Sequence, residues 1–159
     1  MKRPALRRRT LLFNRDYKDL LSCFIAAEVR FLLVGGYALA FHGHVRATKD
    51  IDVWVEPTPD NGQRVWTALA NFGAPLDRLS PADFADSRTV VQIGVSLRRI
   101  DIVCGATGLR FEEAWSRRQT FVLEQLEVPV LGLDDLITNK RHAARLQDLA
   151  DVEALEKLR

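Results

Sequence analysis

The chain has 159 residues, of which 47% are hydrophobic and 28% are charged, and it carries a formal net charge of +2. This size and composition are typical of one globular domain with a sizeable core and argue against a chain that is disordered throughout. Because five of the 23 basic residues lie within the first nine positions, the rest of the chain has 18 basic against 21 acidic residues and is not a general polyanion binder.

Residues 1–13 are expected to form a flexible basic tail, and residues 14–159 a single domain. The basic residues of the tail are Lys2, Arg3, Arg7, Arg8 and Arg9. A frayed, solvated terminus is the simplest interpretation, and phosphate attraction to RNA or DNA is the alternative. No stretch approaches the ~20 apolar residues of a membrane span. Cys23 and Cys104 match no metal or redox spacing, so we expect a protein of the reducing cytoplasm with no membrane contact.

The first half of the chain is expected to form helices and strands around a glycine turn. The predicted elements are a helix from Asn14 or Asp16 to about Val29, a strand over 31–34, a turn at Gly35 and Gly36, a short helix over 37–41, a strand over 50–55 and a helix over 59–72. Asn14 or Asp16 can cap the first helix, whose apolar residues recur at helical spacing. Thr58 suits the cap of the last one, with Pro59 as its first residue and Gly73 as its stop.

The second half is expected to complete a mixed sheet and to end in one long helix. The predicted elements are a helical turn at 80–83, strands over 89–93 and 97–103 joined by a turn at 94–96, a helix over 111–118, β segments over 121–126 and 128–131, and a last helix over about 134–158. Pro129 favours an edge strand, because proline cannot donate to a sheet ladder. The last helix would bury Leu136, Ile137, Ala143, Ala144, Leu149, Val152 and Leu155. This order of elements predicts an α/β (α+β) domain with a mixed β-sheet flanked by helices.

Three aspartates are the candidate catalytic residues. Asp50 and Asp52 lie two positions apart in a strand, so their side chains share one face. Two carboxylates on one face repel each other unless a cation lies between them, and oxygen ligands suit Mg²⁺ or Mn²⁺. Asp101 lies between two isoleucines of a later strand and would join the pair if the strands are neighbours. Three such acids can hold two metal ions that clamp an in-line displacement at phosphorus, and one acid can act as a base.

The alternative is that these acids merely end strands, where they would cap loop amides or pair with Arg46 and Lys49. The upstream pair Gly35 and Gly36 and the apolar frame of Asp101 argue against it. An unrelated domain of this kind would place the three aspartates on no common face.

The same residues resemble the signature of the nucleotidyltransferase superfamily that includes DNA polymerase beta and the CCA-adding enzymes. Here the signature reads Val34-Gly35-Gly36, thirteen residues, Asp50-Ile51-Asp52-Val53, and later Ile100-Asp101-Ile102. The segment 35–55 also resembles small bacterial proteins called nucleotidyltransferase AbiEii-like, which are often discussed as toxin–antitoxin components. The resemblance covers roughly residues 31–151 and implies a minimal nucleotidyltransferase fold.

The resemblance implies a role for each residue of the signature. Gly35 and Gly36 would bring backbone amides against the triphosphate of a nucleoside triphosphate (NTP). Asp50 and Asp52 would bind both Mg²⁺ (or Mn²⁺) ions, and Asp101 would complete the second metal site and help to activate the acceptor hydroxyl. Gly36 stands where many members have serine, so a side-chain hydroxyl on the phosphate is lost.

Arg46, Thr48 and Lys140 are further candidates for phosphate binding. Arg46 and Thr48 match the R-x-T/S-x-D-x-D pattern of related proteins; Arg46 would neutralise phosphate charge or pair with a site carboxylate, and Thr48 is more easily explained by a hydrogen bond within the loop. Lys140 matches a K-x₄-R-x₂-D pattern with Arg145 and Asp148 and would reach phosphate, or else extend to the rim of the helix. Arg145 and Asp148 would form a structural i,i+3 pair.

Three aromatic or imidazole side chains near the motif have simpler explanations. His42 and His44 are expected to be exposed loop residues, because no third ligand is placed to complete a zinc site. Tyr37 could lie near a base or sugar, or be a core ring.

The favoured hypothesis is a metal-dependent nucleotidyltransferase that moves a nucleoside monophosphate (NMP) from an NTP to a hydroxyl and releases pyrophosphate. The acceptor could be an RNA end, a protein side chain or a small molecule. The alternative is a non-catalytic nucleotide-binding or regulatory protein, or one member of a toxin–antitoxin pair that acts by contact with its partner. Three intact aspartates argue against a dead site.

Overall fold

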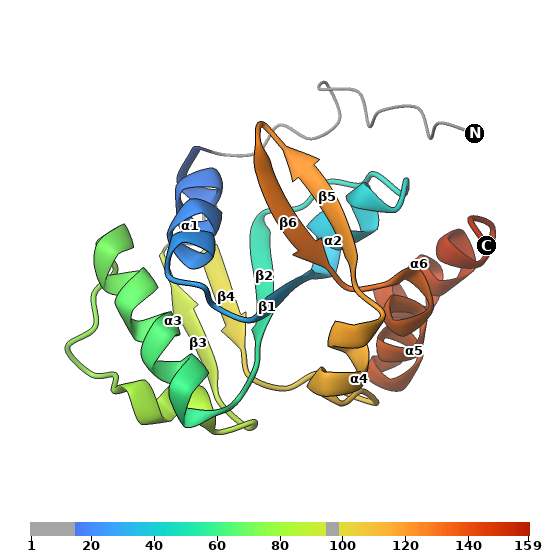
Figure 1. Ribbon diagram of the computed structural model, residues 1–159. Coiled ribbons are helices and arrows are strands. Elements are labelled where there is room, and N and C mark those ends of the chain that lie inside the picture. Colours follow the sequence, from blue (N-terminus) through green and yellow to red (C-terminus); the bar gives the residue numbers. More distant parts are fainter. Residues whose placement is uncertain (1–14, 95–98) are drawn as a thin grey trace.

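The computed structural model describes residues 15–94 and 99–159 of the chain (Figure 1). The predicted basic tail, the cap at Asn14 and most of the turn at 94–96 lie outside the described residues. The elements are α1 (Arg15–Ala26), β1 (Phe31–Val34), α2 (Gly35–Phe41), β2 (Asp50–Val55), α3 (Pro59–Phe72), the 3₁₀ helix η1 (Pro81–Ala85), β3 (Val90–Ile93), β4 (Arg99–Val103), α4 (Phe111–Ser116), β5 (Gln119–Leu123), β6 (Leu126–Val130), α5 (Leu133–Ala143) and α6 (Leu146–Glu156).

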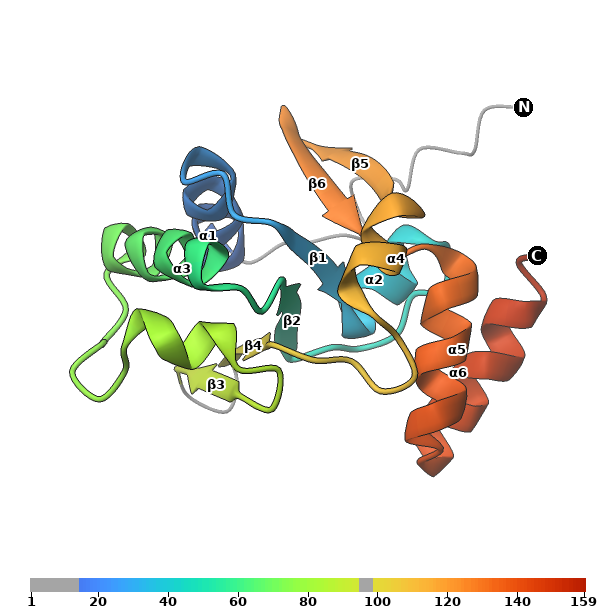
Figure 2. The same ribbon diagram turned by 60° about the horizontal axis from the view of Figure 1, so that its bottom comes forward.

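The six strands form one mixed sheet in the order β3-β4-β2-β1-β6-β5. β2 runs parallel to β4, and β1 runs parallel to β6, while the other neighbouring pairs are antiparallel. α1 and α3 lie side by side on one side of the molecule, and α5 and α6 form a pair on the other (Figures 1 and 2). The predicted mixed sheet flanked by helices is confirmed.

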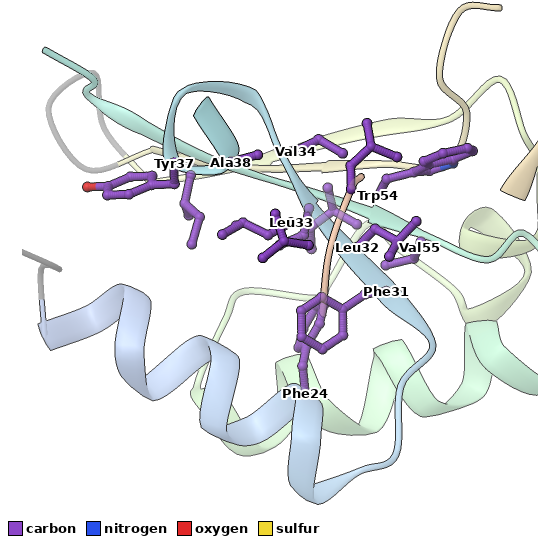
Figure 3. Packing of buried hydrophobic residues seen from close by; sticks show 14 of the residues in the cluster. Phe24, Phe31, Leu32, Leu33, Val34, Tyr37, Ala38, Trp54 and Val55 are labelled. Atoms are coloured by element: carbon purple, nitrogen blue, oxygen red, sulfur yellow. The ribbon is translucent and has the colours of Figure 1, made fainter. Parts of the chain in front are cut away.

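The two faces of β2 have different environments because its side chains alternate. Ile51, Val53 and Val55 are fully buried on the face that also carries Phe31 of β1. Phe31 packs edge-to-face against Phe24 of α1 at 5.3 Å between ring centroids, as Figure 3 shows. On the opposite face, Asp50 and Asp52 are followed by Trp54, whose ring lies 5.1 Å from that of Phe111 in α4. That second face is therefore apolar under α4 and polar at the end of β2 where the aspartates lie.

Local sequence signals account for α3 and for the strands next to it. The Thr58 hydroxyl accepts a hydrogen bond from the Asn61 amide at 3.3 Å, Pro59 is the first helical residue, and Gly73 ends the helix with φ +91°. The bounds of β1 and β2 are those predicted. The predicted helical turn after residue 80 is η1, in which the Asp83 side chain accepts the Ser80 amide at 2.8 Å.

The last helix is where the prediction was wrong. Instead of one helix over 134–158, α5 ends at Ala143 and α6 begins at Leu146, with Ala144 between them at φ +53°. Asp148 accepts the Arg145 amide at 3.3 Å, which starts the new helix. The break turns Asp148 and Asp151 inward, so Ala143, Ala144 and Leu149 are exposed and do not belong to the inner face.

Smaller differences concern the ends of elements and the edge of the sheet. α1 ends at Ala26, three residues before Val29, because Glu28 takes a left-handed conformation (φ +57°) and the Val29 amide bonds back to the Phe24 carbonyl. β6, which contains Pro129, lies between β1 and β5 and is not an edge strand. Its register with β1 is Leu33↔Val130, one residue past Pro129, so the missing proline amide costs that ladder little.

None of the helices in the described part of the chain is long and apolar enough to cross a membrane.

Candidate active site

The three aspartates share one face of the sheet. β2 and β4 are parallel neighbours, with Asp52 opposite Asp101 and Asp50 opposite Arg99. Residues that lie opposite each other in neighbouring strands project to the same face. The predicted common face is confirmed. The alternative, an unrelated domain with acids at its strand ends, predicted no common face and is wrong on that point.

Arg99 joins the aspartates and was missed from the sequence. Its Nη2 lies 2.9 Å from Asp50 Oδ2, and its Nε and Nη2 lie 2.9 and 3.2 Å from the two oxygens of Asp101. The fork of the guanidinium therefore spans both strands. The signal was present, because Arg99 precedes Asp101 by two residues in a strand and must share its face.

The Asp52 carboxylate lies beside those of Asp50 and Asp101. Burial, together with the neighbouring charge of Asp101, a hydrogen bond with it and the charge of Asp50, raises the pKa of Asp52 to about 7, against an opposing effect of Lys140. A group of acids that holds a proton so strongly is a place where added positive charge is favourable.

The glycine turn fits closely against these residues. Gly35 has φ +68°, and a Cβ added there would overlap the carboxylate of Asp52. A Cβ added at Gly36 would lie 2.6 Å from Thr48 Oγ1. Both positions need glycine, because Asp52 lies against the backbone at Gly35 and Thr48 lies against it at Gly36. Thr48 fills the space beside Gly36 and donates to the Asp50 carbonyl at 3.2 Å, which agrees with the predicted loop hydrogen bond.

The aspartates open into a cleft of about 570 Å³ between the sheet and α5. Gly35, Gly36 and Thr48 line one part of it, and Asn139 and Lys140 of α5 line another. The basic residues that line the cleft are Arg46, Lys49, Arg99, Lys140 and Arg145. A cleft with carboxylates on one wall and cations around them has the charge pattern that a metal-bound polyphosphate requires.

Arg46 and Lys140 are both held by Asp151 of α6. Arg46 Nη2 donates to Asp151 Oδ2 at 3.2 Å, so Arg46 does not pair with the trio in the described contacts. Lys140 Nζ lies 3.2 Å from Asp151 and 3.3 Å from Asp148, and Lys140 is buried, so it does not extend to the rim. The Arg145–Asp148 pair (2.7 Å) is confirmed. Asp151, fully buried, was not singled out from the sequence.

Tyr17 of α1 is a third residue that sequence reasoning missed. Its hydroxyl lies 2.7 Å from the carbonyl of Lys49 and 3.1 Å from that of Arg99, at the starts of β2 and β4. Burial raises the pKa of Tyr17 to about 12, so the hydroxyl stays a donor. Only its helical spacing to Leu20 and Leu21 hinted that it is buried.

The histidines and Tyr37 do not line the cleft. His42 is buried, with Nε2 2.7 Å from the Leu131 carbonyl, so the expectation of an exposed residue was wrong, because α2 turns the ring inward. His44 is half-buried, and its Nε2 lies 3.9 Å from Asp151 Oδ1. Tyr37 is a core ring that packs edge-to-face on Tyr17 at 5.7 Å.

The carboxylates suit Mg²⁺ or Mn²⁺ by their chemistry and by their shared face. Across residues 15–94 and 99–159, no group of three or more His, Cys, Asp or Glu side chains is arranged around a point where a metal ion would fit. In this arrangement Asp50 and Asp101 are paired with Arg99. The metal-binding roles of Asp50, Asp52 and Asp101 stay a prediction, as do the phosphate roles of Gly35, Gly36, Arg46, Thr48 and Lys140.

Solved structures of nucleotidyltransferases share this fold. The lincosamide antibiotic adenylyltransferase LnuA, bound to lincomycin, is similar over 92% of this chain and 98% of its own, with a TM-score of 0.58 and 14% identity. TM1012 of Thermotoga maritima, described as a candidate nucleotidyltransferase, gives 0.58 at 14% identity over 90% and 89% of the two chains. The antibiotic-resistance factor ANT(2'')-Ia gives 0.57 at 12% identity over 91% and 88%.

Sequence comparison identifies the family. No curated protein shows significant sequence similarity to the chain. The resemblance to AbiEii-like proteins stays a prediction at the level of the subfamily. The profile of the family described as "Nucleotidyltransferase of unknown function (DUF6036)" matches residues 19–158, and the chain therefore belongs to that nucleotidyltransferase family.

Proposed function

We propose that the protein is a metal-dependent nucleotidyltransferase that moves an NMP from an NTP to a hydroxyl acceptor and releases pyrophosphate. The observation that carries the proposal is the common face of Asp50, Asp52 and Asp101, which lies beside the Gly35 turn at the cleft. Membership in a nucleotidyltransferase family supports the reaction class.

Each residue of the site has a part in the proposed reaction. Asp50 and Asp52 would hold Mg²⁺ or Mn²⁺, and Asp101 would complete the second metal position. Divalent ions would supply neutralisation of the charge on the triphosphate and the leaving group. Asp101 would take the proton of the acceptor hydroxyl, whose oxygen forms a bond to the α-phosphorus as the bond to pyrophosphate breaks. One oxygen–phosphorus bond thus replaces another, and pyrophosphate is the leaving group.

The basic residues of the cleft would bind the NTP. Lys140 is fixed by two buried aspartates, and Arg46 by one of them, so both are already oriented without a ligand. Backbone amides at Gly35 and Gly36 would approach the phosphates as closely as the lack of a side chain permits. Thr48 would act on the substrate only through the loop that it holds.

The acceptor is proposed as a hydroxyl of an RNA end, a protein or a small molecule. Two structures of similar fold carry antibiotics or antibiotic resistance in their descriptions, which favours including small molecules among the acceptors to be tested. A role in a toxin–antitoxin pair rests on the sequence resemblance, and a cytoplasmic location rests on the two free thiols, Cys23 and Cys104.

Transfer of label from the α- or the γ-phosphate tests the reaction. The protein is incubated with each α-³²P NTP, Mg²⁺ or Mn²⁺, and RNA, protein and small-molecule fractions of a cell extract. We expect transfer of the α label and no transfer of a γ label, which leaves with pyrophosphate. The double variant Asp50→Asn/Asp52→Asn should lose transfer, and Asp134→Asn, an exposed aspartate that pairs with Arg159, should keep it. Transfer that survives the double variant would contradict the proposal.

A second candidate is a non-catalytic nucleotide-binding or regulatory protein. Arg99 favours it, because this residue already supplies positive charge to two of the three carboxylates. NTP binding without transfer to any fraction would support this candidate.

A further inference from the structure

We propose that Arg99 is a displaceable counter-ion of the carboxylate site, which competes with divalent cations when no nucleotide is bound and binds the triphosphate once they have entered. The proposal rests on the proposed function, because it concerns the same metal–nucleotide site. It assigns a role to a residue outside the superfamily signature.

The contacts of Arg99 occupy carboxylate oxygens that a metal would need. One guanidinium bonds Asp50 on β2 and both oxygens of Asp101 on β4, at 2.9, 2.9 and 3.2 Å. Each of these oxygens can serve as a ligand for Mg²⁺ or Mn²⁺. A divalent cation on these oxygens would compete with the guanidinium for their lone pairs and repel its charge, so entry of metal would drive Arg99 away.

The ion pairs of Arg99 with Asp50 and Asp101 are partly exposed to solvent. The Arg99 side chain is 35% exposed, and its partners Asp50 and Asp101 are 29% and 11% exposed, all beside the cleft. Asp151 is different, because it is fully buried and its partner Lys140 is only 9% exposed. Exposed ion pairs contribute little stability and exchange readily, while buried ones are costly to break. Arg99, which contacts Asp50 and Asp101 directly, therefore belongs to an ion pair that can exchange.

Displacement would give Arg99 a second use. Its guanidinium lines the cleft with Arg46 and Lys140, which places a flexible cation within the region proposed for the triphosphate. Arginine binds phosphate oxygens in the same bidentate way as carboxylates. Loss of Arg99 should thus strengthen binding of the metal alone and weaken binding of the metal–nucleotide complex.

Mn²⁺ affinity, measured by electron paramagnetic resonance with and without nucleotide, tests both of these expected changes. Without nucleotide, Arg99→Gln should bind Mn²⁺ about tenfold more tightly than wild type, the size expected for loss of a charged hydrogen-bonded competitor. With a non-hydrolysable NTP analogue present, the same variant should bind the Mn²⁺–analogue complex several-fold more weakly than wild type.

Arg88→Gln is the matched control. Arg88 makes the same fork with Asp86, also two residues away, at 3.1 and 3.0 Å, and it does not line the cleft. Its variant should bind Mn²⁺ as wild type does. Arg99→Lys, which keeps the charge but loses the fork, should tighten Mn²⁺ binding by a smaller factor and serves as the test if Arg99→Gln does not fold.

The outcomes separate this proposal from the proposed function. If wild type binds Mn²⁺ and Asp52→Asn does not, while the Arg99 variants match wild type or bind more weakly, the role of Arg99 is overturned and the metal site stands. If no variant binds Mn²⁺ even with the analogue, both proposals fail. Tighter Mn²⁺ binding by Arg99→Gln together with weaker binding of the complex supports the exchange.

Discussion

Gly35 lies under the strictest steric constraint of the site, because its missing side chain leaves the space that the Asp52 carboxylate occupies. Gly73 has a similar left-handed backbone (φ +91°) but nothing within 4 Å of an added Cβ. Alanine at either position should cost about 1–2 kcal/mol of stability through backbone strain. Gly35→Ala should in addition reduce transfer by at least ~100-fold, because it would displace a carboxylate of the proposed metal site.

Denaturation and initial rates of the two alanine variants check this prediction. A loss of stability in both variants, larger in Gly35→Ala because of the overlap with Asp52, and a loss of activity in Gly35→Ala alone are the expected pattern. Full activity in Gly35→Ala would show that Asp52 is free to move without consequence for the reaction.

The crowded carboxylates should make the stability of the metal-free protein fall as pH rises. The pKa of Asp52 is raised from 3.8 to about 7 in the folded protein, so the folded state binds the proton more tightly than the unfolded state. Its contribution to stability is complete below about pH 4 and is lost as the pH rises through about 7. Asp52→Asn should remove this dependence, and Mg²⁺ should raise Tm more at pH 8 than at pH 5.5.

Thermal unfolding of wild type and Asp52→Asn at pH 5.5 and pH 8, with and without Mg²⁺, measures this pH dependence of stability. Each kcal/mol corresponds to roughly 2–4 °C for a domain of this size. Identical pH dependence in the two proteins would contradict the assignment to Asp52.

The residues of the site were predictable to the extent that strand alternation determines them. Asp50 and Asp52 had to share a face, and Asp101 joined them because β4 is the neighbour of β2. The contact of Arg99 with Asp50 depends on the register between two strands almost fifty residues apart, which no local pattern encodes. Likewise, the hydroxyl of Tyr17 reaches the site only through the packing of α1 on the sheet.

At the scale of elements, the junction of α5 and α6 positions the basic residues of the cleft. Asp151 is fully buried and bonds Arg46, Lys140 and Gln147. Asp151→Asn would remove the charged partner of Arg46 and one of the two carboxylates that hold Lys140. We therefore expect a loss of about 3–5 kcal/mol in the free energy of unfolding. The KM for NTP should rise more than kcat falls, because Arg46 and Lys140 are proposed to bind the nucleotide.

Urea denaturation and steady-state kinetics test this junction. Asp134→Asn is the control, since Asp134 also pairs with an arginine but is exposed on α5. Its stability and KM should match wild type. Wild-type KM in a folded Asp151→Asn would show that the position of Arg46 and Lys140 does not depend on this carboxylate.

The break between these helices could not be foreseen from the usual signals. The segment 143–146 contains neither glycine nor proline, and alanine at 144 is a good helix former that nevertheless takes φ +53°. The burial of two aspartates beside Lys140 outweighs local propensity there. By contrast, α3 was predicted closely because Thr58, Pro59 and Gly73 each act locally.

At the scale of the whole molecule, the order of elements along the chain was predictable and the order of strands in the sheet was not. The mixed sheet follows from the succession of helices and strands. Long-range pairing sets the place of β6 inside the sheet, against the local signal of Pro129. The cleft is likewise a product of assembly, since the sheet supplies its acids and α5 supplies Lys140.

The most direct test of the account is a crystal structure with Mn²⁺ and a non-hydrolysable NTP analogue, read from the anomalous signal of manganese. We expect Mn²⁺ at about 2.0–2.3 Å from oxygens of Asp50, Asp52 and Asp101, with the triphosphate beside Gly35 and Gly36 and Arg99 moved onto phosphate. Manganese or nucleotide bound away from these carboxylates, with Arg99 still on Asp50 and Asp101, would contradict it.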